Sequence, residues 1–386
     1  MHWQKSDAMK VLITGANGFI GQNLRLYLAQ RPDIEVVCFT RADDTAHLPA
    51  FLEGVDFVFH LAGVNRPQDP SEFRVGNTDL SKALCEALCA VAVATGKKVP
   101  VVFTSSIQAG RDNPYGDSKQ GAEDALLSAK RDSGIPMHIF RLPNVFGKWC
   151  RPNYNSAVAT FCHNIARGLP IQVNDPAAPL TLVYVDDVIE RFVALMDGTD
   201  GADAAAAPDD FATVSPQYTT TVGELARDIQ SFKDSRVTLM TERVGTGLLR
   251  ALYSTYVSYL PVEMFAYPVP QHGDPRGVFV EMLKTPDCGQ FSFFTAHPGI
   301  TRGGHYHHTK TEKFLVIKGQ ARFRFRHMQT GQMHELTTTG EKSEIVETVP
   351  GWTHDITNIG SDEMIVMLWA NEVFDRARPD TFACPL

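Results

Sequence analysis

The feature that most constrains the fold is a glycine-rich turn after an apolar run near the N-terminus. The run Val11–Thr14 predicts a buried strand, and it leads into the string TGANGFIG (14–21). In a strand–turn–helix unit, such glycines permit a tight turn, close approach of the backbone to a pyrophosphate and close helix–strand packing. The N-terminus of the following helix offers free N–H groups and a positive dipole end to phosphates. The residues predicted to bind a dinucleotide here are Gly15, Asn17, Gly18, Phe19, Ile20 and Gly21.

The end of the next apolar run, Glu35–Phe39, bears on which dinucleotide binds. Proteins that bind NAD usually place an acidic side chain at this point, where it bonds the ribose 2′-hydroxyl. This chain has Thr40 and Arg41 instead, and a guanidinium can neutralise a 2′-phosphate and bond it with two N–H groups. We therefore predict NADP(H) rather than NAD(H). In the alternative interpretation, Arg41 is solvated and Asp43 or Asp44 contacts the ribose.

Two patterns divide the chain. Through the first two-thirds, apolar runs alternate with amphipathic stretches, which predicts an α/β domain with a Rossmann-type, doubly wound parallel sheet. After residues 267–277 the signals are short strands and turns, which predict an all-β sandwich or barrel. We therefore expect a dinucleotide-binding domain over 9–250, and a connector with a β domain over 251–386. The expected strands are 11–14, 35–39, 57–61, 99–104, 138–142, 278–283, 290–295, 313–318, 321–326, 343–349 and 363–369.

Tyr115 and Lys119 form a YxxxK pair. On a helix, residues four apart share a face, so the phenol and the ammonium should point into one site. A nearby cation lowers the pKa of a phenol, and Tyr115 can then exchange a proton with a carbonyl oxygen while a hydride moves at carbon. Ser106 lies at the end of an expected strand, and its hydroxyl can bond the same oxygen. Ser106, Tyr115 and Lys119 are therefore the predicted catalytic residues of a hydride transfer.

Several strings resemble the extended short-chain dehydrogenase/reductases that act on nucleotide sugars. They are TGANGFIG (14–21), HLAG (60–63), TSS (104–106), YGDSK (115–119) and RLPNVFG (141–147). The resemblance implies that Lys119 also holds the nicotinamide ribose, and that Asn144 contacts the sugar nucleotide. It further implies cofactor contacts by Leu61, Ala62 and Gly63.

Two details separate the reactions of that family. Members that eliminate water carry Asp-Glu directly after the catalytic Ser or Thr, whereas Ile107 and Gln108 follow Ser106 here, so dehydration is not expected. An internal 4-epimerase retains its NAD, so the apparent NADP preference favours net reduction of a ketone. Candidate partners for the diphosphate or uracil, each of which also fits an ordinary surface residue, are Arg66, Lys148, Arg151, Asn153 and Asn155.

A second constellation lies in the predicted β domain. His305 and His307 are two apart on an expected strand and should face one cavity, which Glu312 and His354 would enter from neighbouring strands. Three imidazoles and one carboxylate make a site for a divalent metal. Zinc is the first choice, and iron, manganese and nickel stay open. His308 is expected to be a neighbour rather than a ligand.

The spacing of these residues resembles both cupin motifs, the second one loosely. Two strings, DPRGVFVE (274–281) and EKFLV (312–316), resemble the deoxyhexulose-nucleotide epimerases, which invert a carbon beside a keto group through an enolate. That resemblance implies a substrate contact by Arg276, and a cation near the keto oxygen supplied by Lys313 or the metal. The acid and base are not identified, and the candidates are Tyr306, His308 and Asp274.

Nearly all of residues 9–386 resemble the bifunctional reductase–cupin enzymes of capsule and O-antigen synthesis, the CapF/WbjC type. The resemblance includes the strings NVFGKWCRPNYNS (144–156) and HHTKTEKFLV (307–316). It implies a UDP-2-acetamido-2,6-dideoxy-4-hexulose that is epimerised at C3 and then reduced at C4 with NADPH, towards UDP-N-acetyl-L-fucosamine. It also implies a homodimer. Two interpretations stay open: a reductase whose cupin is a metal-stabilised structural or dimerisation module, or one whose cupin senses a ligand.

Bulk properties narrow the classes of partner. The net charge of -8 argues against a nucleic-acid or anionic-membrane surface as the main partner. The seven cysteines are scattered without a CxxC pair, which is typical of reduced thiols in the cytosol. The N-terminal segment has no apolar core of signal-peptide length, and no apolar run is long enough to span a bilayer. We therefore expect a cytoplasmic enzyme with a UDP-sugar substrate.

Overall fold

The computed structural model describes residues 8–199, 211–269, 271–274, 277–280, 283, 289–372 and 377–386. The chain forms two compact units, Met1–Val145 with Thr181–Tyr218, and Phe146–Leu180 with Thr219–Leu386. It passes between the units at residues 145–146, 180–181 and 218–219. The domain boundary expected at residue 250 stays a prediction, because compactness alone does not say which segments fold independently.

The first unit is built on a six-stranded parallel sheet in the order β2-β1-β3-β4-β5-β8. Its strands are β1 (Met9–Thr14), β2 (Ile34–Phe39), β3 (Phe57–His60), β4 (Val101–Ser106), β5 (Met137–Leu142) and β8 (Phe211–Ala212). The five strands expected here are confirmed, and their ends differ from the expected ones by no more than two residues at either end.

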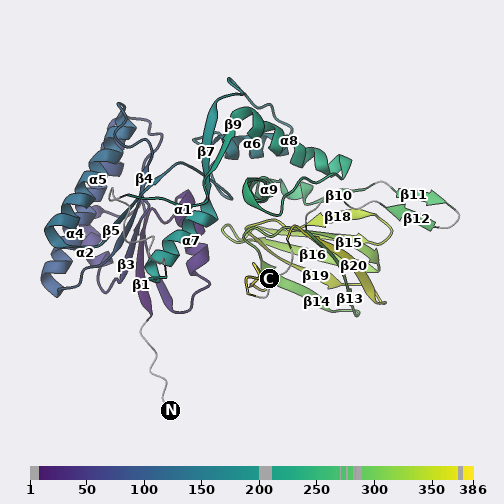
Figure 1. Ribbon diagram of the computed structural model, residues 1–386. Coiled ribbons are helices and arrows are strands. Elements are labelled where there is room, and N and C mark those ends of the chain that lie inside the picture. The colour runs from purple at the N-terminus through teal and green to yellow at the C-terminus, as the bar shows by residue number, and fades with distance from the viewer. Residues whose placement is uncertain are drawn as a thin grey trace, which may run out of the picture. The chain divides into compact units, whose positions relative to one another are not determined.

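Helices cover both faces of this sheet (Figure 1). On one face lie α2 (Leu48–Phe51), α4 (Leu80–Thr95) and α5 (Pro114–Ser133), and on the other lie α1 (Phe19–Leu28) and α7 (Val185–Met196). The shorter helices are η1 (Thr45–His47), α3 (Ser71–Phe73) and a π-helix, η2 (Arg74–Asp79). Because both faces are covered, β3 and β4 are buried along their whole length, which explains why apolar residues follow one another without alternation in Phe57–Phe59 and Val101–Phe103.

The strand order reverses on either side of β1. The chain leaves β1 for β2 on one side and later returns to β3 on the other. In open α/β sheets, ligands bind at such a switch point, in the crevice outside the carboxyl ends of the strands. The ends of β1, β3 and β4 therefore meet at the edge where a cofactor is expected.

The second unit contains two antiparallel sheets of five strands, which form a cupin-like sandwich. One sheet has the order β10-β18-β15-β20-β13 and the other β17-β16-β19-β14-β21. Aromatic rings interdigitate between the two sheets, and the ring centroids of Phe314 on β15 and Phe323 on β16 lie 5.7 Å apart. The strands are β10 (Ala266–Pro268), β13 (Gln290–Ala296), β14 (Thr301–Tyr306), β15 (Glu312–Lys318), β16 (Gln320–His327), β17 (Met333–Thr339), β18 (Glu344–Glu347), β19 (Trp352–Asn358), β20 (Met364–Ala370) and β21 (Phe382–Ala383).

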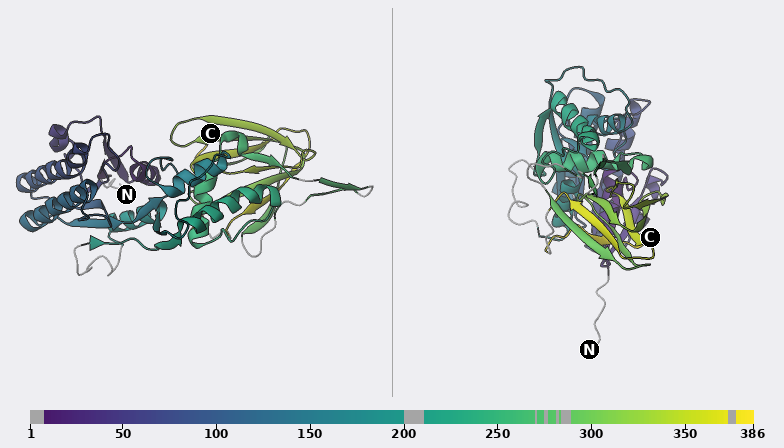
Figure 2. Two further views of the ribbon diagram at one scale, coloured as in Figure 1. Left: turned by 90° about the horizontal axis from the view of Figure 1, so that it is seen from above. Right: turned by 90° about the vertical axis from the view of Figure 1, so that its right-hand side faces the viewer.

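Helices α6 (Ala157–Ala166), α8 (Val222–Thr238) and α9 (Gly247–Ser258) belong to the same unit and pack against one another. Helix α9 is followed by the short η4 (Val262–Met264). Strands β11 (Gln271–Asp274) and β12 (Gly277–Val280) pair with each other as a separate arm (Figure 2). A further sheet consists of β6 (Asn144–Phe146), β7 (Pro179–Tyr184) and β9 (Tyr218–Thr221). Across the described residues, every helix is too short or too polar to cross a lipid bilayer.

Candidate active site and candidate metal centre

The glycine turn brings the ends of β1 and β3 into contact. Gly15 has a φ of +69°, and a Cβ there would lie 2.6 Å from the backbone nitrogen of Ala62. The predicted cofactor residues Leu61 and Ala62 therefore lie directly against the turn, and only glycine fits at position 15. Helix α1 begins after Gly18 without a side-chain cap, so the N–H groups of its first turn are available to an anion.

The residues after β2 bear on the choice between NADP and NAD, which stays a prediction. Arg41 is exposed. Asp43 accepts hydrogen bonds from the backbone nitrogen of Thr40, at 2.7 Å, and from its hydroxyl, at 2.8 Å. Asp44 accepts from the backbone nitrogen of Ala46, at 2.9 Å. Both carboxylates are thus occupied by hydrogen bonds within local turns. Arg41 is therefore the better candidate for contacting the 2′ position of a ribose.

The three predicted catalytic residues come together at the carboxyl end of β4. Ser106 is the last residue of that strand, and Tyr115 and Lys119 lie in the first two turns of α5. The helix starts at this point because Asn113 caps it, accepting from the backbone nitrogen of Gly116 at 2.9 Å. The hydroxyl of Ser106 lies close enough to the phenol of Tyr115 to lower its pKa. The hydroxyl and the phenol can therefore bond one carbonyl oxygen together.

The ionisation of this site differs from the expectation. Burial raises the pKa of Tyr115, and the hydrogen bond from Ser106 only partly offsets that effect. Burial also lowers the pKa of Lys119 to about 8, against the attraction of Glu123. The Lys119 ammonium donates to the carbonyl oxygen of Thr104 at 2.9 Å. The predicted lowering of the tyrosine pKa by Lys119 is therefore wrong for this geometry, in which burial of the phenol is the larger effect.

A residue that sequence reasoning missed joins the cofactor loop to the catalytic helix. Asn77 accepts from the backbone nitrogen of Val64 at 2.8 Å and donates to the hydroxyl of Ser118 at 2.9 Å. A Cβ on Gly63 would lie 3.2 Å from both the Asn77 amide oxygen and the Lys119 ammonium nitrogen. Asn77 lies in η2, and π-helical turns are rare and often mark functional sites. No motif in the sequence signals that turn.

The predicted substrate contacts have different surroundings. Asn144 is exposed and donates to the carbonyl oxygen of Thr181 at 3.2 Å. Arg151 is exposed in the second unit, where its guanidinium lies 5.0 Å from the ring centroid of Tyr154. Arg276 lies outside the described residues. All three remain predictions.

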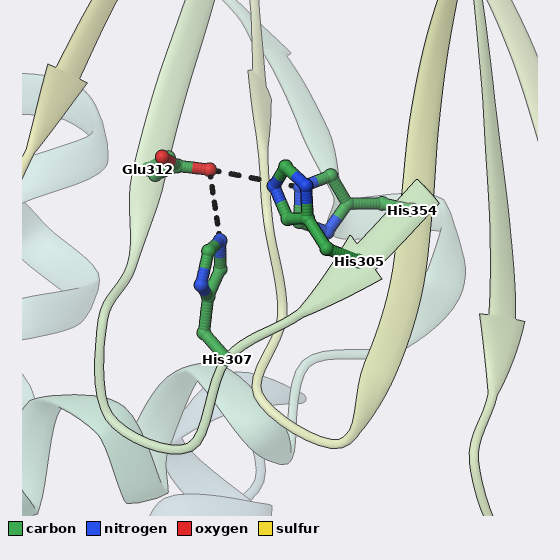
Figure 3. Close-up of side chains that lie close together, drawn as sticks. All are labelled: His305, His307, Glu312 and His354. Carbon is green, nitrogen blue, oxygen red and sulfur yellow. Dashed lines mark hydrogen bonds and ion pairs between the residues drawn. The ribbon is translucent and has the colours of Figure 1, made fainter. Parts of the chain in front are cut away.

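The four predicted metal ligands form one cluster in the cupin-like unit (Figure 3). One potential ligand atom from each of His305, His307, Glu312 and His354 lies within 4.8 Å of all the others. Glu312 lies on β15 in one sheet, and His305 and His354 pair across β14 and β19 in the other. His354 therefore comes from the strand next to that of His305, as expected, whereas Glu312 reaches the cluster from the opposite sheet and not from a neighbouring strand.

A β-bulge turns His305 into the sandwich. Gly303 pairs with Asp355 and His305 pairs with His354, so Gly304 is an extra residue in β14. Both glycines have positive φ values, +96° and +71°. Side chains alternate between the two faces of a strand, so an extra residue reverses the alternation beyond it. In a regular strand, His305 would lie on the same face as Gly303, and its imidazole would point away from Glu312.

The unmatched polar atoms of the cluster fit a cation. His354 is 3% exposed, and neither of its ring nitrogens has a hydrogen-bond partner among the described residues. Its Nε2 lies 3.6 Å from the Glu312 carboxylate, and the Nε2 of His307 lies 3.1 Å from the same oxygen. Burial, reinforced by the neighbouring imidazoles, lowers the pKa of His305 to about 3. Neutral imidazoles around one carboxylate are the donors that zinc prefers.

Lys313 does not face this cluster. It follows Glu312 on β15, and consecutive residues of a strand point to opposite faces. Its ammonium pairs with Glu347 and donates to the phenol oxygen of Tyr267 at 2.9 Å. Glu347 also pairs with Arg236 of α8. This buried ion cluster argues against the expectation that Lys313 supplies a cation beside the four predicted metal ligands.

A different lysine approaches the metal ligands, and sequence reasoning missed it. The Lys310 ammonium lies 3.9 Å from a Glu312 carboxylate oxygen, and it donates to the hydroxyl of Thr381 at 2.7 Å. The side chain is 8% exposed. Lys310 lies in the loop 307–311, outside a regular strand, so no alternation of side chains indicated where its ammonium points.

Comparisons with known proteins cover both units. Residues 11–207 match the NAD dependent epimerase/dehydratase family, and residues 272–382 match the polysaccharide biosynthesis C-terminal domain. A UDP-2-acetamido-2,6-beta-L-arabino-hexul-4-ose reductase of Pseudomonas aeruginosa is 62% identical over 97% of this chain and 98% of its own length. The crystal structure of the capsular polysaccharide assembling protein CapF from Staphylococcus aureus is 40% identical. It covers 98% of this chain and 100% of its own, with a TM-score of 0.64.

Proposed function

Because the chain belongs to the CapF-type family of extended short-chain dehydrogenase/reductases with a C-terminal polysaccharide biosynthesis domain, we propose that it is a reductase of a UDP-linked 4-keto sugar. The proposed substrate is a UDP-2-acetamido-2,6-dideoxy-4-hexulose on the route to UDP-N-acetyl-L-fucosamine. The cupin-like unit first inverts C3, and the first unit then reduces C4. Assembly as a homodimer belongs to the same proposal.

The reductase half is carried by the full-length similarity to a hexulose reductase, together with the arrangement of Ser106, Tyr115 and Lys119. NADPH, when bound at the glycine turn, supplies the hydride. Tyr115 donates a proton to the C4 oxygen, and Ser106 hydrogen-bonds that oxygen while the negative charge develops. Lys119 holds the nicotinamide ribose from the same face of α5. The exposed guanidinium of Arg41 supports the choice of NADPH over NADH.

The epimerase half rests on the cluster around Glu312. A base removes the C3 proton and leaves an enolate, and an acid returns a proton to C3 from the other face. A bound divalent metal supplies positive charge at such a site. Lys310 takes the place of Lys313 as the nearby protein cation, because its ammonium lies 3.9 Å from the Glu312 carboxylate. Asn144, Arg151 and Arg276 remain the proposed contacts to the sugar nucleotide.

A second candidate is a reductase whose cupin-like unit has a structural or sensing role. The number of predicted ligands favours a structural role, because zinc sites with four protein ligands are usually closed and structural. The two candidates differ in whether the C3 proton exchanges with solvent in the absence of reduction.

The test uses the Tyr115→Phe variant, which should lose about 10²–10⁴-fold in reduction and leave the cupin-like unit unchanged. The variant is incubated in D2O with the 4-keto sugar nucleotide and without NADPH, and the C3 proton is followed by NMR. Deuterium uptake at C3 that disappears when His305 is also changed to alanine would support the epimerase. No uptake above an enzyme-free control, from folded and metal-loaded protein, would favour the second candidate.

A further inference from the structure

We propose that the segment Asp380–Ala383 is a positioning element of the metal centre, and that Asp380 fixes the orientation of the ligand His307. The inference rests on the metal binding proposed above. The segment extends the sheet that carries two of the ligands, because β21 pairs with β14 and places Ala383 opposite His305. The ring centroid of Phe382 lies 5.5 Å from that of Tyr306, the residue between His305 and His307 in the sequence.

The backbone of Asp380 selects the tautomer of His307. The carbonyl oxygen of Asp380 lies 2.6 Å from the Nδ1 of His307. A carbonyl oxygen can only accept, so Nδ1 carries the hydrogen. Nε2 is then the nitrogen that can bind a metal, and it points to the Glu312 carboxylate at 3.1 Å, to which it donates a hydrogen bond whenever it carries a proton. Imidazoles that bind metals usually donate their other ring N–H in this way, which sets both tautomer and ring orientation.

The carboxylate of Asp380 holds the turn between two ligands. One of its oxygens accepts from the backbone nitrogen of His308 at 2.9 Å. The other accepts from the backbone nitrogens of Thr309 and Lys310, at 2.9 and 2.6 Å. These three N–H groups follow His307 directly, so the carboxylate fixes the backbone that leads from His307 towards Glu312. Asp380 has a φ of +37°, in a region where Asp and Asn are favoured over most residues.

The next residue extends the support to a third ligand. The hydroxyl of Thr381 accepts from the Lys310 ammonium at 2.7 Å, and that ammonium lies 3.9 Å from Glu312. His305, His307 and Glu312 are thus each supported by a residue of 380–383, through strand pairing, a hydrogen bond to the ring and a neighbouring cation respectively. A segment that only covered the sandwich would not need to contact the ligands by three separate routes.

The test compares the Zn²⁺ affinity of the full chain with that of Asp380→Asn, by competition with a chromogenic chelator. Asparagine keeps the backbone preference, but it places an NH2 group against the N–H donors. The expected loss is 10–100-fold, typical of removing an outer-shell partner, or about 1.4–2.7 kcal/mol. Asp362→Asn makes the same chemical change at an exposed position of the same unit and should leave the affinity unchanged.

Long-range ¹H–¹⁵N NMR of the histidine rings in the metal-free protein reports the tautomer of His307. A variant that only lost stability would not change that tautomer. The original chain should show His307 with its hydrogen on Nδ1. Asp380→Asn keeps the backbone carbonyl but loosens the loop that holds the ring against it, so it should show a smaller fraction of rings with the hydrogen on Nδ1. Unchanged affinity in Asp380→Asn, or weaker affinity with the tautomer retained, would overturn the inference. A chain that takes up no Zn²⁺ at all would instead overturn the metal centre and with it the proposed epimerase.

Discussion

Replacing Glu347 with glutamine is expected to lower the free energy of unfolding of the second unit by about 3–5 kcal/mol, the usual cost of stranding a buried charge. Glu347 is 3% exposed, and its carboxylate pairs with Lys313 on β15 and with Arg236 on α8. The side chains of these two cations are 2% and 8% exposed. Glutamine has nearly the same shape but no charge, so both cations would remain buried without a counter-ion.

Lys313→Met is the control for Glu347→Gln, because it removes one member of the same ion cluster without leaving a buried charge alone. Glu347 keeps Arg236 as its partner in that variant, and methionine fills much of the space of the lysine chain, so the cost should stay below about 2 kcal/mol. In the Lys313→Met background, Glu347→Gln strands one cation rather than two. The double-mutant cycle should therefore show a coupling of roughly 1–3 kcal/mol. Because Lys313 faces away from the metal ligands, Lys313→Met should also keep the C3 exchange.

Urea unfolding followed by tryptophan fluorescence measures these costs. The tryptophans of the described residues, Trp149, Trp352 and Trp369, all belong to the second unit. Changing Trp3, which lies outside the described residues, to phenylalanine confines the signal to that unit. A loss below about 1 kcal/mol for Glu347→Gln would refute the reasoning, because it would mean that water reaches both cations.

The same cluster predicts a loss of stability in acid. Burial alone would raise the pKa of Glu347, but the attraction of Lys313 and Arg236 is stronger and holds that pKa below its ordinary value of 4.5. A carboxyl group of this kind stabilises the fold above its unfolded pKa, and the contribution disappears as the pH falls through the lower folded value. Glu347→Gln should therefore flatten the dependence of unfolding free energy on pH below about 4.5.

Three further predictions concern the first unit. Arg41→Ala should weaken NADPH binding by about 10–100-fold, as expected for a lost charge-assisted pair, and leave NADH almost unchanged in fluorescence titrations; equal effects on both would exclude Arg41 as the 2′-phosphate ligand. The kcat/KM of reduction should fall as the pH rises through about 8, because Lys119 then loses its proton; a profile that is flat to pH 9 would contradict this role. Gly15→Ala should abolish binding of both dinucleotides, because its methyl group would meet the backbone of Ala62 at 2.6 Å, and calorimetric binding equal to that of the original chain would disprove that argument.

The sequence was most informative where chemistry and local geometry coincide. The glycine turn, the YxxxK pair and the histidine spacing are short patterns whose function depends on residues close together in the chain. The five parallel strands of the first unit were predictable because strands buried on both faces are almost uniformly apolar. The cluster of three histidines and a glutamate was predictable as a set, because few spacings of these residue types bring them together by chance.

The features that were missed depend on register and on distant contacts. The face of Lys313 depends on which residue of β15 points to the histidine cluster, and a shift of one residue reverses every side chain. The bulge in β14 was not expected, because two consecutive glycines, Gly303 and Gly304, do not show which residue stays unpaired. Asp380 is 73 residues from His307, and nothing in its neighbourhood marks it. These features arise from tertiary packing, which single-sequence patterns do not encode.

The interleaving of the two units has a consequence for the order of events during synthesis. Helix α6 belongs to the second unit, and its buried side chains, among them Phe161 and Ile165, pack in a layer with α8 and α9. Ribosomes make α7 and β8 of the first unit before either of those helices. A nascent chain that has just completed the first unit must therefore carry α6 with its apolar face exposed to solvent. During this interval α6 can bind a chaperone or pack wrongly against another part of the chain.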